Sequence, residues 1–162
     1  MNPLMVNGWK LYAHPLFLEQ VKTLTAQVQQ LEAKDPQGYH KKSATKRLAA
    51  IVKLALQDIP QNPADPQYRQ GNTLGKAHRH WHRAKFYQQY RLFFRYDLAS
   101  KIIIYAWVND TRTKRAYESD QDAYRVFSKM LKNGHPPNTW EDLKSEIDQT
   151  NLNPLQHLLG DG

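Results

Sequence analysis

The sequence predicts an α+β fold, in which helices pack on a small antiparallel sheet of three or four strands. Two consecutive strand patterns lie at the centre of the chain. Residues 90–96 alternate between apolar or aromatic side chains on one face and Arg91 and Arg95 on the other, and residues 101–108 form a continuous apolar run. Amphipathic helical patterns precede and follow these strands. The chain has 162 residues, enough for one domain with its own core, which we place over residues 1–150.

A pair of antiparallel helices is predicted before the sheet. Residues 1–14 are expected to be irregular, and Pro15 can begin a helix because its missing N–H would have no partner in the first turn. Apolar side chains at spacings of four and three extend this helix over residues 15–34, and a second apolar stripe predicts a helix over 40–58. A loop rich in proline and glycine follows over 59–75.

Three antiparallel strands are predicted next, over residues 81–86, 90–96 and 101–108. Residues 97–100 form the predicted hairpin loop between the last two strands. Because side chains alternate across a strand, this arrangement places four cations on one open face of the sheet. These cations are Arg83, Lys85, Arg91 and Arg95.

Two further helices are predicted after the sheet, over residues 121–133 and 140–149. Ser119 or Asp120 can cap the first and Thr139 the second, because the side-chain oxygens of these residue types accept hydrogen bonds from the first N–H groups of a helix. The last residues, 151–162, are expected to form a polar and partly disordered tail.

The positive charge of the chain is concentrated on the predicted sheet. The whole chain has 23 Lys and Arg against 15 Asp and Glu, a formal net charge of +8. Residues 76–117 contain ten of these cations and only two acids, so this segment carries the entire excess. Positive charge concentrated on one surface is typical of proteins that bind a phosphate backbone.

The composition excludes several other classes of protein. The chain has no cysteine, which excludes disulfides, thiolate metal sites and a cysteine nucleophile and fits a cytoplasmic protein. No apolar run is long enough for a membrane span. His78, His80 and His82 alternate as metal ligands on a strand would, but no carboxylate accompanies them and nearby arginines would repel a cation. RNA contact is therefore the better interpretation of these histidines, and we expect neither a metal nor a cofactor.

A series of motifs runs through residues 6–145. They are VNGW, YAHP, KDP, YRLFFRY, W-x-ND-x-x-T-x-R-x-Y, DAY-x-VF-x-KML and GHPP-x-x-W, in that order. Together they resemble the YhaV toxins, a family within the RelE/ParE-like superfamily of toxin–antitoxin systems. The resemblance implies a RelE-like fold, with the N-terminal helix pair packed on the sheet and helices at the C-terminal end.

The resemblance also implies a function and a partner. The chain is expected to be an mRNA-cleaving endoribonuclease, acting in the cytoplasm on free or ribosome-bound mRNA, and to be neutralised by a cognate antitoxin of the PrlF type, which is AbrB-like. Two alternatives stay open. One is a non-catalytic ParE-like toxin that inhibits DNA gyrase, because a fold does not fix a function. The other is a basic RNA-binding module.

Site residues follow from the positions that RelE-type ribonucleases use. The implied catalytic residues are Arg83 and Lys85 on the first of the three strands, and Arg91, the arginine that opens the YRLFFRY motif after Tyr90. Arg112 and Tyr117 after the last strand, and His135, complete the set. The expected RNA contacts are His82, Arg95, Lys114, Arg115 and Tyr124. The general base stays open among Lys85, His82 and His135, because Arg-Ala-Lys stands where the family pattern has a lysine pair.

These residue types suit cleavage through the ribose 2′-OH. Such a reaction needs a base for the 2′-OH, positive charge beside the phosphorane and a proton for the leaving 5′-oxygen. Arginines stabilise the phosphorane through paired N–H donors, and a lysine or histidine can take the proton. The sequence offers no acidic cluster to bind a divalent metal, so metal-independent cleavage is expected.

Overall fold

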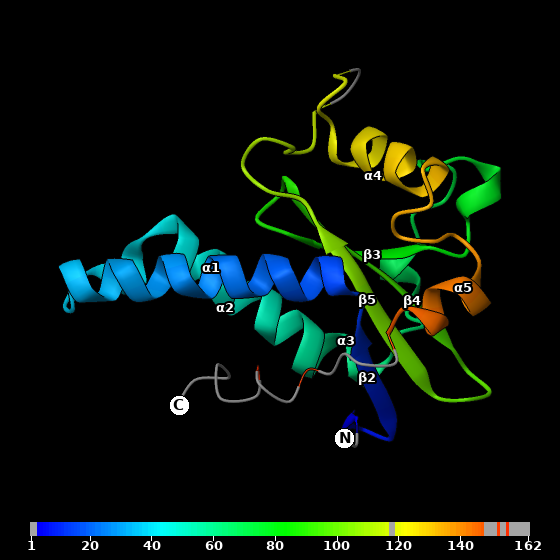
Figure 1. Ribbon diagram of the computed structural model, residues 1–162, viewed down its shortest axis with the longest axis horizontal. Coiled ribbons are helices and arrows are strands. Elements are labelled where there is room, and N and C mark those ends of the chain that lie inside the picture. Colours follow the sequence, from blue (N-terminus) through cyan, green and yellow to red (C-terminus); the bar gives the residue numbers. More distant parts are fainter. Residues whose placement is uncertain (1–2, 117–118, 148–151, 153–154, 156–162) are drawn as a thin grey trace.

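A five-stranded mixed sheet forms the centre of the molecule (Figure 1). The computed structural model describes residues 3–116, 119–147, 152 and 155. The strands follow the order β1-β2-β5-β4-β3, in which β2 is parallel to β5 and all other neighbours are antiparallel. Their bounds are Leu4–Val6 (β1), Trp9–Ala13 (β2), His82–Phe86 (β3), Tyr90–Asp97 (β4) and Ile102–Val108 (β5).

The three predicted strands are confirmed as β3, β4 and β5, but the prediction of a purely antiparallel sheet is wrong. The N-terminal segment that was expected to be irregular forms the hairpin of β1 and β2. Asn7 and Gly8 make its turn with φ angles of 51° and 82°. Trp9, Leu11 and Ala13 are buried at every second position, which is the strand period. β2 then pairs in parallel with β5, so the sheet gains two strands.

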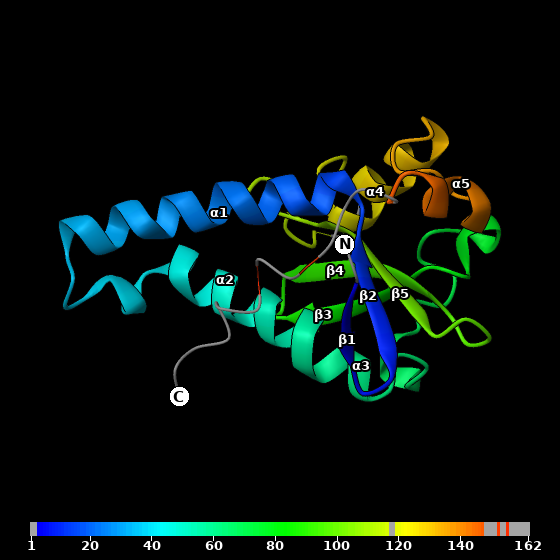
Figure 2. The same ribbon diagram turned by 60° about the horizontal axis from the view of Figure 1, so that its bottom comes forward.

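Helices α1 and α2 lie side by side and cover one face of the sheet (Figures 1 and 2). α1 spans Pro15–Lys34, as predicted, and the His14 ring caps it by accepting a hydrogen bond from the Leu16 N–H at 3.1 Å. α2 spans Ser43–Lys53 and continues through a π-helical turn, Leu54–Asp58, into α3, Ile59–Gln61. Their apolar stripes pack on the same face of β2, β4 and β5 to form the first core.

The opposite face of the sheet is covered by α4, Ala123–Lys132, and α5, Trp140–Ser145. Phe127 stacks on Phe93 with ring centroids 4.2 Å apart and on Trp107 at 5.7 Å, which fixes α4 to the sheet. The prediction that the arginine face is open is therefore wrong. Arg83 and Arg91 do lie on this face, but α4 leaves them only 9% and 7% exposed.

The cap of α4 also differs from the prediction. Asp122, and not Ser119 or Asp120, accepts the hydrogen bond of the first turn, from the Tyr124 N–H at 3.0 Å. Thr139 caps α5 as predicted.

The described part of the C-terminal segment is apolar. Leu152 and Leu155 fall within the predicted polar tail, yet both are buried in the first core. Among the helices that the structure describes, none combines the length and apolar character needed to cross a membrane.

Candidate active site

Arginines from two neighbouring strands meet at one phenol on α4. The Arg83 Nε, from β3, donates to the Tyr124 phenolic oxygen at 2.9 Å, and the Arg91 Nε, from β4, donates to the same oxygen at 3.2 Å. The Lys85 side chain follows on this face, because Lys85 lies directly opposite Arg91 in the strand register. Lys85 is exposed at the edge of the sheet.

Backbone carbonyls hold the two guanidinium groups in place. Arg83 Nη1 donates to the Gln67 carbonyl at 2.7 Å, and Arg91 Nη1 donates to those of Gln88 and Tyr90 at 2.7 and 3.0 Å. The Nη2 group of each arginine donates to no described residue, yet neither is among the buried atoms that lack a partner. Each Nη2 therefore keeps contact with solvent and stays available for a ligand.

Among the residues that the structure describes, neither arginine has a counter-charge. None of the ion pairs formed by the described residues involves Arg83 or Arg91. A buried charge without a partner is costly, and a buried pair of like charges more so. The arrangement therefore favours an anion with oxygens that reach both Nη2 groups, such as a phosphate.

The loop after β5 closes the site through Asn109 and Arg115. The buried Asn109 side chain accepts from the Arg91 N–H at 2.6 Å and donates to the Gln89 and Thr113 carbonyls at 2.9 and 2.8 Å. Arg115 pairs with the buried carboxylate of Asp122, and its guanidinium lies 4.6 Å from the centroid of the Tyr124 ring. The loop is thereby tied both to β4 and to the first turn of α4.

The comparisons with known proteins agree on one family. The family model Toxin_YhaV matches residues 11–148. It describes toxins with endonuclease activity from toxin–antitoxin systems. The chain is 49% identical over 150 residues to the ribonuclease toxin YhaV of Escherichia coli K12, across 91% of this chain and 97% of that protein. The toxin YhaV of E. coli O157:H7 gives the same identity and coverage. The chain belongs to the YhaV toxin family. No solved structure matches it.

The arginine expected from the YhaV resemblance after the last strand is exposed. Arg112 lies in the loop, where its backbone N–H donates a hydrogen bond to the Asp110 carboxylate at 2.9 Å and its side chain bonds to no described residue. Lys114 is also exposed, and Tyr117 lies outside the described residues. Arg115, which the sequence suggested as an RNA contact, is the loop arginine that lies over the Tyr124 ring.

Sequence reasoning missed Asn109 and Asp122. Asn109 stands in the W-x-ND motif of the YhaV family, and a buried asparagine directly after a strand could have been recognised as a loop organiser. Asp122 stands one residue before the apolar pattern of α4, which is the N-cap position.

Two other predicted RNA contacts lie away from this cluster. Arg95 is held between Trp81 and Trp140, with its Nη1 donating to the Asn138 carbonyl at 2.7 Å, and burial lowers its pKa to about 10. The His82 ring packs on the opposite face of the sheet, 4.8 Å from the Tyr96 ring, and burial lowers its pKa. Both side chains are partly buried, and their predicted RNA contacts stay a prediction.

His135, the remaining catalytic candidate, belongs to a second cluster at the far end of α4. Its ring lies 5.6 Å from that of His14, and His14 Nε2 is 2.8 Å from the Glu146 carboxylate. Tyr124 is in the first turn of α4 and His135 follows the last, so about 15 Å of helix separates the two clusters. The structure therefore does not bring His135 to the arginines.

The cluster of His14, His135 and Glu146 has the composition of a metal site, with ligand atoms within 4.8 Å of one another. The bonds of His14 argue against that role. Its Nδ1 accepts from the Leu16 N–H, so the neutral ring carries its proton on Nε2 and donates it to Glu146. A metal on Nε2 would require a proton on Nδ1 and would break the cap of α1.

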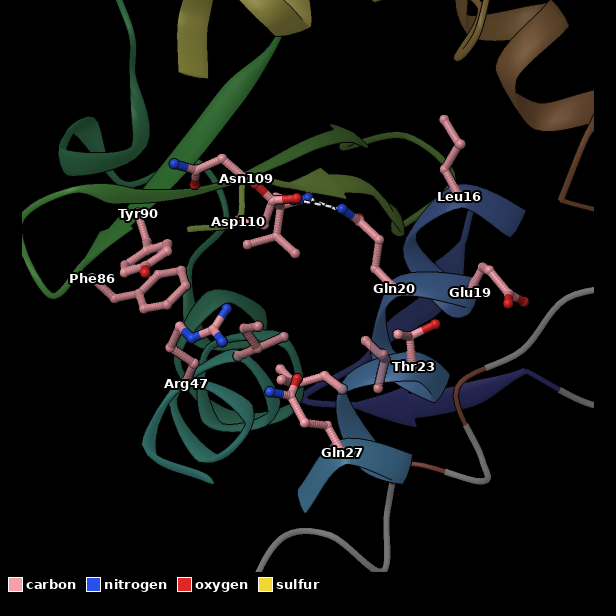
Figure 3. Close-up of a pocket in the computed structure, with 14 residues that line it drawn as sticks. Leu16, Glu19, Gln20, Thr23, Gln27, Arg47, Phe86, Tyr90, Asn109 and Asp110 are labelled. Atoms are coloured by element: carbon pink, nitrogen blue, oxygen red, sulfur yellow. Dashed lines mark hydrogen bonds between the residues drawn. The ribbon is translucent and has the colours of Figure 1, made fainter. Parts of the chain in front are cut away.

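A cavity of about 330 Å³ lies behind the site, between α1, α2 and the ends of β3, β4 and β5 (Figure 3). Arg47 reaches it from α2 and lies 5.6 Å from the Tyr90 ring centroid, while its buried Nε has no acceptor. Tyr90 and Asn109 line the cavity on one side and bond to Arg91 on the other. No sequence pattern indicated this cavity, because elements distant in the chain form it.

Proposed function

We propose that this chain is an endoribonuclease toxin that cleaves mRNA by attack of a ribose 2′-OH on the adjacent phosphate. The observation that supports this most strongly is the pair of buried guanidinium groups of Arg83 and Arg91, which have no counter-charge in the described part of the chain and keep one Nη2 each for a ligand. Such a preorganised pair suits the extra negative charge of a phosphorane. The family description and the name of the E. coli K12 relative, ribonuclease toxin YhaV, support the same activity.

The proposed roles follow from where each side chain lies. Arg83 and Arg91 hold the scissile phosphate, and Lys85, exposed and opposite Arg91, takes the proton of the 2′-OH. Arg112 and Lys114, exposed on the loop, bind neighbouring phosphates. We assign no step to His135, because α4 separates it from the arginines.

The fold and the partners are part of the same proposal. The helices on a sheet with cationic central strands support a RelE-like arrangement. Free or ribosome-bound mRNA in the cytoplasm is the proposed substrate, and the proposed partner is an antitoxin of the PrlF type with a segment rich in Asp and Glu. Since α4 and α5 occupy the sheet face, we place that segment at the sheet edge, near Lys85 and the cationic loop of residues 110–116.

The proposal is tested with purified protein and RNA in EDTA, with and without ribosomes. We expect cleavage that EDTA does not abolish, with 2′,3′-cyclic phosphate or 3′-phosphate ends and 5′-hydroxyl ends. Ribosomes in the EDTA samples must be shown to stay intact. Loss of cleavage in EDTA and its recovery with a divalent metal would reject the mechanism, and uncut RNA together with inhibited DNA gyrase would favour the ParE-like alternative.

A further inference from the structure

The Tyr124 phenol has a proton that no described residue uses. A phenolic oxygen offers one O–H donor and two acceptor positions. The Nε groups of Arg83 and Arg91 fill both acceptor positions, at 2.9 and 3.2 Å. Tyr124 donates to no acceptor among the described residues. The proton is therefore directed toward whatever binds in front of the two arginines.

Positive charge surrounds Tyr124 on α4. The Tyr124 side chain is only 5% exposed, but the residue forms part of the wall of a groove of about 340 Å³ along α4. The other residues that line this groove are Thr73, Arg125, Ser128, Lys129 and Lys132. Arg125 pairs with Asp120 at 3.3 Å, and Lys129 and Lys132 add positive charge that suits an RNA backbone. A phosphate would approach the phenol past the Nη2 groups of Arg83 and Arg91, which keep contact with solvent.

The surroundings of Tyr124 also stabilise the anion that forms when the proton leaves. A phenolate would accept charge-assisted hydrogen bonds from both Nε groups, which are already in place before reaction. The ring itself is fixed, edge-to-face with Phe93 at 5.6 Å between centroids and beneath the Arg115 guanidinium. Proton loss therefore needs no rearrangement of the site.

We propose that Tyr124 is the general acid of the cleavage reaction, an assignment that rests on the function proposed above. The 2′-oxygen forms a bond to phosphorus and gives its proton to the general base, while the bond from phosphorus to the 5′-oxygen breaks and that oxygen takes the proton of Tyr124. The products are a 2′,3′-cyclic phosphate and a 5′-hydroxyl. Solvent then returns a proton to the Tyr124 phenolate and removes one from the general base.

The test compares two leaving groups in the Tyr124→Phe variant. The cleavage position is first mapped on native RNA, and a second RNA is made with sulfur in place of the bridging 5′-oxygen there. A thiol ionises at about pH 8.5, so the sulfur of the second RNA leaves as a thiolate without a proton. The 5′-oxygen of the native RNA needs a proton to leave. At saturating RNA, Tyr124→Phe should cleave the native substrate about 10²–10⁴-fold more slowly than the unmodified protein and the sulfur substrate at nearly the same rate.

Two control variants separate proton donation from other roles. Arg91→Met removes charge stabilisation, so it should slow cleavage of both RNAs. Tyr12 packs on the same core as Tyr124, and its phenol makes no hydrogen bond among the described residues. Tyr12→Phe should therefore slow cleavage of neither RNA.

Each outcome decides the assignment. Equal losses on both RNAs in Tyr124→Phe would show that the phenol only positions the arginines, and no loss on either would show that it has no role. Failure of the unmodified protein to cleave native RNA, with or without ribosomes, would instead overturn the proposed function itself.

Discussion

At the scale of single residues, the site is built from charges that the fold leaves uncompensated. Arg83 and Arg91 are among the few buried charged side chains of the described chain, whereas buried Asp122 is paired with Arg115. Replacing a buried charge by an apolar side chain of similar size is often neutral or stabilising. Stability alone therefore does not explain the two arginines, and binding of an anion does.

The role of Arg91 predicts a loss of rate rather than of affinity. Arg91→Met keeps the volume but removes the Nη2 donor, so cleavage at saturating RNA should slow by about 10²–10³-fold. Arg112→Met removes an exposed cation and should weaken binding and lower the salt slope by about one, with little effect on the saturated rate. The measurement is single-turnover cleavage beside equilibrium binding.

The matched control is Lys46→Met, an exposed position on α2, which should alter neither quantity. Circular dichroism establishes that each variant is folded. If Arg91→Met cleaves saturating RNA at the rate of the unmodified protein, Arg91 has a binding role only.

At the scale of elements, the first turn of α4 assembles the site. Asp122 caps the helix and holds both Arg115 and the Ala116 N–H, at 2.5 and 2.6 Å from one carboxylate oxygen. Tyr124, two residues later, accepts from β3 and β4. One helical turn therefore joins two strands and the loop after β5, which explains why cations distant in the chain converge.

Loss of these contacts of Asp122 should strongly lower the stability of the fold. Asp122→Ala removes both the cap and the ion pair with Arg115, so the free energy of unfolding should fall by about 3 kcal/mol. Ser119→Ala removes a side-chain oxygen whose one bond to a described residue is with the Gln121 N–H, at 3.2 Å, and should cost less than about 0.5 kcal/mol. Urea denaturation measures both, and equal effects would contradict the role given to Asp122.

At the scale of the whole molecule, buried histidines predict a pH-dependent stability. Burial is the largest cause that lowers the pKa of His14, His80 and His82 below the ordinary value of 6.5. The unfolded chain therefore binds protons at a higher pH than the folded protein. The free energy of unfolding should be constant above about pH 7.5 and fall as the pH drops below about 6.5.

Urea unfolding at a series of pH values between 8 and 5, in buffers of equal ionic strength, checks this prediction. A stability that stays level or rises as the pH falls from about 7 to about 5 would show that these rings are already charged in the folded protein.

Much of the fold and part of the site follow from local patterns. The strand periodicity of β3, β4 and β5, the bounds of α1 and the cap of α5 were all predicted correctly. The concentration of charge on the central strands and their family motifs pointed to Arg83, Lys85 and Arg91, whose catalytic roles stay a prediction. The residues that hold these arginines escaped prediction, because Asn109 and Asp122 act through contacts with distant strands.

The sequence by itself determined the secondary structure near the site, its positive charge and the family to which the chain belongs, because periodicity, composition and motif order are properties of short segments. Only the tertiary structure decided which face those charges share and what covers it. The parallel pairing of β2 with β5 and the packing of Phe127 on Phe93 and Trp107 are contacts between distant segments. They bury Arg83 and Arg91 beneath α4, and this burial makes the two cations the preorganised phosphate site that we propose.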